Sequence, residues 1–465
     1  MRLLPCCLVS LTLIGCPRPR PAVPGPPDLL VFYASGVRGA VASPNAGPGG
    51  MARRATLVDR TRVNGRPILQ VDAGDLTPQV EDEPSLTDAV ARANRTRLVF
   101  QSYRRMGVDV VTLGESDWAL GGATLQSLAR DEKVRVVAAN VRGKDGKLLF
   151  AAHESFETGT VKVGVFGIFE DRAGAPPLPD GLTVTDPQVA ARDAVTALRA
   201  SGAQMVIGLF HLAGGRPRAQ AIADAAGNID VIVLGHADEP APPRFVAVAA
   251  RGGELGLLQV RLAEEGRKKG SAKAGVTLED QRFAVGPDVP EQYGVRLVLR
   301  ATEPVYTTFL ESEAALSKAK GRRTYGEEWQ YGTTGLCKGC HSSQFAQWSS
   351  TDHAHAFASL TDGREKEPGC MGCHMTGFLV PGGVQNLESA HYFVDVGCEA
   401  CHGPSTAHVT STDKHRGTSR KVDPVLCFGC HTPDQNRGPF VLAEAMKEMV
   451  GPGHGQPLPA AAPPH

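Results

Sequence analysis

Eight cysteines in the last third of the chain form four Cys-x-x-Cys pairs, and a histidine follows each pair directly. This spacing is the attachment signature of c-type haem, in which two thioethers fix the porphyrin and the adjacent histidine binds the iron. Zinc is the alternative, because Cys-x-x-Cys pairs also form Cys₄ sites, but such sites do not require a histidine after every second cysteine. The sequence therefore predicts four covalent haem c groups, held by Cys337, Cys340 and His341; Cys370, Cys373 and His374; Cys398, Cys401 and His402; and Cys427, Cys430 and His431.

These four motifs occupy only residues 337–431 of the 465-residue chain. So short a segment cannot build a conventional core, and we expect short helices and loops wrapped round porphyrins that form the apolar interior. Haems packed this densely must lie close together, which favours electron transfer as the function.

Two longer patterns surround the haem motifs, WSSTDHAHA at 348–356 and CHGPSTAH at 401–408. With them, residues 330–435 resemble the cytochrome c-554 family of tetrahaem cytochromes. The resemblance implies that His353 and His408 are distal iron ligands, and we expect His391 to be a third. It also implies that one haem, that of the second motif, is five-coordinate. Whether this holds depends on His355, His391 and His415, which the sequence leaves open.

Residues 28–289 are built differently. Apolar, β-rich runs such as 29–33, 161–168 and 205–210 alternate with helical stretches, which indicates an α/β body whose strands are covered on both faces. Later runs, at 244–249, 254–262 and 276–284, lack long helices between them and suggest an antiparallel portion.

Polar signatures follow several of these strands: DAGD at 72–75, LGESD at 113–117, FHLAG at 210–214 and LGHAD at 234–238. Their order and spacing resemble the 5'-nucleotidase branch of the calcineurin-like metallophosphoesterases over about residues 28–285. The resemblance implies a four-layer α/β sandwich derived from a two-metal enzyme. The complete prediction is a multidomain chain in which this sandwich precedes a mostly helical and loop multihaem domain.

The departures from that family concern the metal ligands. The family supplies Asp-x-His after its first strand, whereas residues 29–58 contain no Asp, Glu or His. Glu115-Ser116 replaces the family's Asn-His pair, and Asp238 replaces a histidine. Two-metal phosphoester hydrolysis is therefore not expected. Two interpretations stay open for the remaining residues: a single divalent cation, or a hydrogen-bonded relic. Those residues are Asp75, Glu115, His211 and His236.

The N-terminal segment predicts an exported protein that is tethered to a membrane. Residues 1–16 look like a lipoprotein signal that ends at a lipidated Cys16, although an ordinary signal peptide is the alternative. Residues 17–27 form a proline-rich tether, 290–329 a helical linker, 330–440 the haem domain, and 441–465 a short helix with a disordered tail that contains His454.

The charges balance, with 49 Lys+Arg against 49 Asp+Glu, so we expect no nucleic-acid partner. The expected function is electron transfer to unknown redox partner proteins at the periplasmic face of a bacterial membrane or at the cell surface. The alternatives are a haem enzyme acting on nitrogen oxides or hydroxylamine at an open haem, a phosphohydrolase with a cytochrome appendage, and a docking module.

Overall fold

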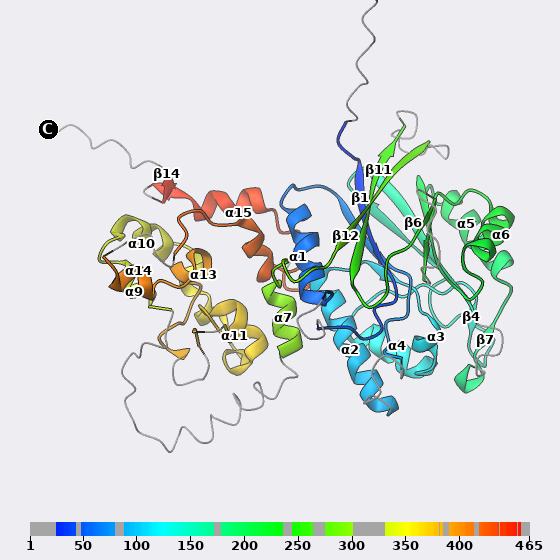
Figure 1. Cartoon of the computed structure of the whole chain (residues 1–465), viewed down its shortest axis with the longest axis horizontal. Coiled ribbons are helices and arrows are strands. Elements are labelled where there is room, and N and C mark those ends of the chain that lie inside the picture. The colour runs from blue at the N-terminus through cyan, green and yellow to red at the C-terminus, as the bar shows by residue number, and fades with distance from the viewer. Residues whose placement is uncertain are drawn as a thin grey trace, which may run out of the picture.

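Two differently built parts follow one another along the chain (Figure 1). The computed structural model describes residues 25–42, 48–79, 88–171, 178–235, 244–263, 275–300, 331–380, 382–384, 390–412, 418–436, 438–452 and 454–456. The first part is an α/β body, and the second consists of short helices and loops.

Two five-stranded sheets form the centre of the α/β body. The first has the order β12 (Val276–Ala284), β11 (Glu254–Leu262), β1 (Leu29–Ala34), β2 (Ile68–Asp72) and β3 (Val110–Val111). The second has the order β10 (Phe245–Val246), β9 (Val231–Leu234), β8 (Met205–Leu212), β6 (Val161–Glu170) and β5 (His153–Thr158). In the first sheet β1, β2 and β3 run parallel, whereas β11 and β12 are antiparallel, as the sequence predicted for these two runs. The prediction was wrong for the run at 244–249, because β10 lies in the second sheet and pairs parallel with β9.

Alternation along β1 shows how the layers are held together. Leu29, Val31 and Tyr33 lie in the apolar cluster shared by the two sheets, while Leu30 and Phe32 point the other way, into a cluster on the helical side. Helices α1 (Met51–Arg62) and α2 (Ala89–Met106) cover the first sheet, and α5 (Pro187–Ala200) and α6 (Gly215–Ala226) cover the second. The predicted four-layer sandwich is confirmed.

Short elements complete the α/β body and make up the second part. The body also contains α3 (Glu115–Trp118), α4 (Gly122–Asp131), and the strand pair β4 (Val141–Arg142) and β7 (Thr183–Val184). The helices of the second part include α9 (Thr334–Cys337), α10 (Ser342–Ser349), α11 (Pro368–His374), α13 (Cys398–His402), α14 (Thr406–Thr410), the 3₁₀ helix η7 (Pro424–Gly429) and α15 (Leu442–Met449). None of the described helices is both long and apolar enough to cross a bilayer.

Helix α7 (Tyr293–Arg300) joins the two parts (Figure 1). It contacts α1 and α2 on one side and α11 and η7 on the other. The helix predicted for 294–300 is therefore present, while residues 301–329 of the predicted linker lie outside the described residues.

The C-terminal segment is more ordered than predicted. After the expected helix α15, strands β13 (Gly451–Pro452) and β14 (Gly455–Gln456) pair with each other, so the prediction of disorder is wrong for the described residues of this segment. Side chains of α10 anchor the segment, because the amide of Gln347 donates to the carbonyl oxygen of Glu448 at 2.8 Å. Residues 457–465 lie outside the described part of the chain.

Candidate haem ligands and a candidate metal centre

The histidine of each Cys-x-x-Cys-His motif is the predicted proximal ligand of its haem. Three of these four proximal histidines each face one histidine that is distant in the sequence. His341 lies opposite His408 with ring centroids 6.1 Å apart, and His431 lies opposite His353 at 6.0 Å. Both partners were predicted as distal ligands. The third pair joins His402 to His454 at 6.1 Å, and this partner was not predicted.

The separation within these pairs fits an iron between the rings. A metal held by two imidazole nitrogens lies about 2 Å from each, so the two ring centroids are roughly 6 Å apart. Direct stacking brings rings closer, as in the contact between His431 and Phe440 at 4.3 Å. One such separation is compatible with a chance aromatic contact, but the same value at three of four proximal histidines indicates a common cause.

Backbone and side-chain acceptors orient several of these imidazoles. Nδ1 of His374 donates to the carbonyl oxygen of Ala356 at 2.6 Å, and Nδ1 of His402 donates to that of Ser419 at 2.7 Å. Nδ1 of His454 donates to the side-chain oxygen of Gln347 at 2.8 Å. These bonds leave Nε2 of each ring as the ligand atom, the usual arrangement for a metal-bound histidine.

The pairs also favour neutral imidazoles, the form that binds a metal. Burial, followed by the nearby ring of His431, lowers the pKa of His353. Burial and then His402 lower the pKa of His454, and burial lowers that of His431.

The fourth proximal histidine is different. Within the described part of the chain, no imidazole lies opposite His374, whose Nδ1 hydrogen-bonds with the carbonyl of Ala356 and the hydroxyl of Ser359. His391, predicted as a distal ligand, is exposed and packs against the ring of Tyr392. The structure brings His454 to the third motif in its place, and His415 lies outside the described residues.

Contacts between cysteines of different motifs give the order of the attachment sites. The thiol of Cys373 lies in hydrogen-bond contact with that of Cys430, and Cys337 with Cys398. Cys401 and Cys427 are close enough to interact electrostatically. The attachment sites are thus neighbours in the order second, fourth, third, first.

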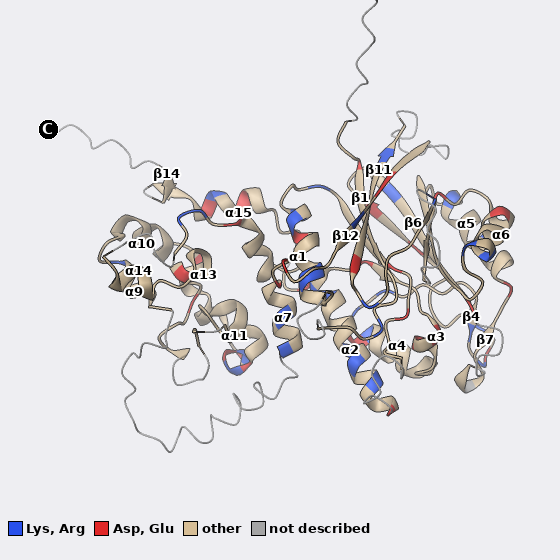
Figure 2. Ribbon diagram, in the orientation of Figure 1, with Lys and Arg blue, Asp and Glu red and all other residues tan. Residues whose placement is uncertain are grey.

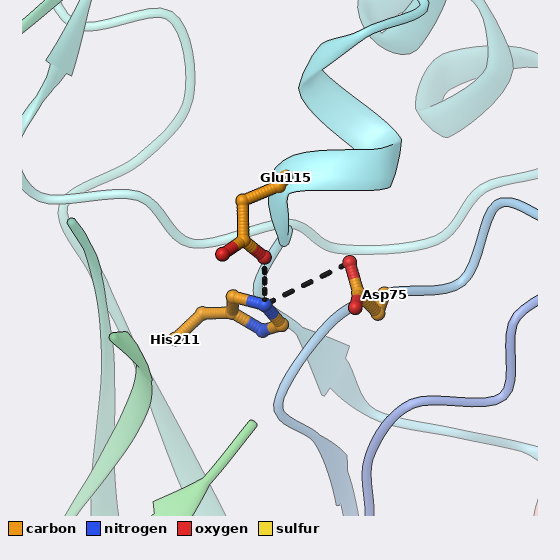
Figure 3. Close-up of side chains that lie close together, drawn as sticks. All are labelled: Asp75, Glu115 and His211. Atoms are coloured by element: carbon orange, nitrogen blue, oxygen red, sulfur yellow. Dashed lines mark hydrogen bonds and ion pairs between the residues drawn. The ribbon is translucent and has the colours of Figure 1, made fainter. Parts of the chain in front are cut away.

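A second cluster of ligand-type side chains lies in the α/β body (Figure 3). Asp75 follows β2, Glu115 begins α3 after β3, and His211 belongs to β8, so the carboxyl ends of three strands converge here. One ligand atom from each of the three lies within 4.8 Å of the others. His236, the fourth predicted ligand, lies outside the described residues.

The orientation of His211 suits a metal. Its Nδ1 donates to the carbonyl oxygen of Ala73 at 2.8 Å, which directs Nε2 toward Glu115 Oε2 at 2.6 Å and Asp75 Oδ1 at 3.7 Å. A Cβ on Gly114 would lie 2.4 Å from Cε1 of His211, so only glycine fits beside the ring. Burial disfavours the imidazolium, but the charges of Asp75 and Glu115 outweigh it and raise the pKa of His211 to about 9. Without a metal, the protonated His211 supplies the positive charge that stabilises the two carboxylates of the cluster.

The other oxygen of Asp75 faces a cation already in the chain. Arg38 Nε lies 3.8 Å from Asp75 Oδ2, and the amide of Gln79 donates to the same oxygen at 3.3 Å. Arg38 follows β1, where the related phosphoesterases were expected to supply metal ligands. The Ser116 hydroxyl donates to Asp75 Oδ1 at 2.7 Å. The three carboxylate and imidazole ligands fit one divalent cation, and a guanidinium stands on the opposite side of Asp75.

Sequence reasoning missed Arg38, Asp117 and His454. Asp117 is fully buried and accepts the backbone N–H groups of Leu76, Thr77 and Gly114, thereby fixing the loops that carry Asp75 and Glu115. Burial, reinforced by the charge of Asp75, raises the pKa of Asp117 to about 6. For His454 the sequence offered no signal beyond a histidine in the tail, because three predicted distal ligands and one five-coordinate haem already accounted for four irons.

The two parts of the chain are similar to different known proteins. Residues 336–403 match the model of the family described as cytochrome c554 and c-prime. Cytochrome c-554 of Nitrosomonas europaea is 34% identical over 84 residues, which cover 15% of this chain and 36% of that protein. The C-terminal part therefore carries a cytochrome c554 domain, and such a domain indicates electron transfer through haem c.

The α/β body resembles proteins of a different kind. A 5'-nucleotidase of Vibrio vulnificus is 27% identical over 254 residues, covering 50% of this chain and 44% of that protein. The sulfate thiohydrolase SoxB of Thermus thermophilus shares the fold, with a TM-score of 0.50, 19% identity and coverage of 62% of either chain. The body is thus 5'-nucleotidase-like in sequence and metallophosphoesterase-like in fold. The chain spans less than half the length of the curated relatives that it matches.

Proposed function

We propose that this protein is a tetrahaem c-type cytochrome that transfers electrons, exported and tethered to a bacterial membrane through a lipid on Cys16. The observation that carries the proposal is the set of three histidine pairs with ring centroids 6.0–6.1 Å apart, each containing one Cys-x-x-Cys-His histidine. Haem c attached at the four motifs would supply one-electron redox chemistry.

The protein's own residues would hold the haems in a continuous series. The contact of Cys373 with Cys430, the proximity of Cys401 to Cys427, and the contact of Cys337 with Cys398 support an electron path through motifs two, four, three and one. Bis-histidine ligation at three motifs would keep those irons six-coordinate, and histidine pairs favour lower potentials than histidine–methionine pairs.

Mass spectrometry and visible spectroscopy of protein matured in a host that attaches haem c test this proposal. Four added haem masses, and a reduced-minus-oxidised spectrum of haem c in which low-spin haem predominates, are the expected results. A product that contains zinc and no covalent haem would refute it.

A second function is favoured by the position of His374, which lacks an opposing imidazole within the described residues. An open coordination position there would let the protein act on a small nitrogen oxide or on hydroxylamine. Turnover of either substrate that is lost in His374→Ala, with the other haems intact, would support this enzyme function. Electron transfer alone predicts no such turnover.

We further propose that the α/β body binds one divalent cation at Asp75, Glu115 and His211 and is inactive or nearly inactive as a phosphoesterase. The guanidinium of Arg38 beside Asp75 Oδ2 supports a single ion, because it would repel a second one. In this proposal the body serves mainly to hold the cytochrome domain, and the protein acts at the periplasmic face or the cell surface with redox proteins as its partners.

A further inference from the structure

The contact between the two parts of the protein lies at two of the haem motifs. Helix α7 packs on the glycine that precedes the second cysteine of each. A Cβ on Gly372, within Cys370–Cys373, would lie 2.2 Å from Leu297 Cδ1, and Gly294 approaches the carbonyl oxygen of Gly429, within Cys427–Cys430. The equivalent Gly339 of the first motif has nothing within 4 Å. The α/β body and α7 thus form a seat for the second and fourth haems.

Charged residues from α2 reach the same seat. Nε of Arg105, a buried residue, lies 3.4 Å from Asp434 Oδ2, and Nε of the more exposed Arg104 lies 3.5 Å from the same oxygen. The other carboxylate oxygen, Oδ1, accepts from the Thr432 hydroxyl at 2.7 Å, and Thr432 directly follows His431. Figure 2 shows Lys and Arg along α2 and α7 at the boundary between the parts.

The charge of Arg105 is felt at the second motif. Arg105 and Asp434 both lie close enough to Cys373 to interact with it electrostatically. The ion pair therefore acts on the second motif as well as on the fourth, and because both side chains are buried, water screens their charges little.

We propose that the buried Arg105–Asp434 pair sets the reduction potential of the two haems seated on this interface, with Arg105 raising the potential and Asp434 lowering it. The fusion to the α/β body would then have an electronic consequence as well as a structural one. A positive charge favours the reduced haem, because reduction removes one positive charge from the iron. This inference rests on the proposed haem attachment.

The test is spectroelectrochemical titration of the full-length haem-loaded protein and its variants. Arg105→Gln should shift the ferric-to-ferrous ratio about tenfold toward ferric at a fixed potential, a fall of ~59 mV for a one-electron couple. That size corresponds to one unit charge about 12 Å from the iron at an effective dielectric constant of about 20. Asp434→Asn should shift the same haems in the opposite direction.

Matched variants separate charge from packing. Arg105→Lys keeps the charge and should stay near the wild-type potential, and the double variant Arg105→Gln with Asp434→Asn should also return toward it. Arg104→Gln should shift the potential less, because Arg104 is more exposed and also pairs with Glu132 at 3.7 Å. Equal haem content and an unchanged proportion of low-spin and high-spin haem in all variants are required for the comparison.

Two results would overturn the proposal: no shift in either single variant, or shifts of Arg105→Gln and Asp434→Asn in the same direction, which would indicate loosened packing. Failure of the underlying haem assignment is distinguishable, because the wild-type protein would then contain no covalent haem.

Discussion

Replacing His454 by Ala should open one additional iron to carbon monoxide. The structure places His454 opposite His402, and its Nδ1 donates to Gln347, so its Nε2 is held as a ligand atom. In the wild-type reduced protein only the haem at His374 should bind carbon monoxide, giving about one ligand per four haems. Loss of His454 removes the sixth ligand from the third haem, and the stoichiometry should rise to about two. Titration of the reduced protein, followed in the Soret band, measures this number directly.

The matched control for this experiment is His391→Ala. His391 also lies in the cytochrome domain, but its ring packs on Tyr392, and the variant should retain one carbon monoxide per chain. His408→Ala and His353→Ala should each give two, as His454→Ala does. A value of one for His454→Ala together with two for His391→Ala would refute the ligand set derived from the ring separations. A wild-type value of zero would show that His374 has a distal ligand after all.

Four further outcomes are expected. The protein should bind about one Mn²⁺ per chain by calorimetry, with an affinity that rises about tenfold per pH unit between about 6.5 and 9, because the ion displaces the proton of His211; a pH-independent affinity would exclude His211 as a ligand. In metal-free protein the raised pKa of His211 stabilises the fold fully below its unfolded value near 6.5, and this contribution should be lost in denaturant titrations as the pH rises through about 9. Phosphoesterase activity with nucleotides and a chromogenic diester should stay near background, since a missing general acid alone costs about 10²–10⁴ in rate, and turnover abolished by Asp75→Ala would contradict this. Finally, Cys16→Ser should move the protein from membranes to the soluble periplasmic fraction, and unchanged fractionation would argue against the lipid anchor.

Much of the α/β body was predictable because strands and helices follow local patterns. The runs at 29–33 and 161–168 appear as β1 and β6, since alternating or continuous apolar residues need a covered sheet whatever the rest of the chain does. Asp75, Glu115 and His211 were predictable as a group because each closely follows or ends a strand, and strand ends of such sheets meet. The role of Arg38 was not predictable, because it depends on the contact between its side chain and Asp75. No motif in the sequence around residue 38 indicates that contact.

In the haem domain, too, some features were predictable from the sequence and others were not, for a physical reason. Covalent attachment and proximal ligation use residues adjacent in the sequence, so the four Cys-x-x-Cys-His motifs alone determined how many haems to expect and which cysteines would hold them. A distal ligand comes from the opposite face of the porphyrin and can come from any part of the chain. Only the folded chain brings His454 across from a glycine-rich tail to His402, leaves His391 at the surface, and seats Gly372 and Gly429 against α7.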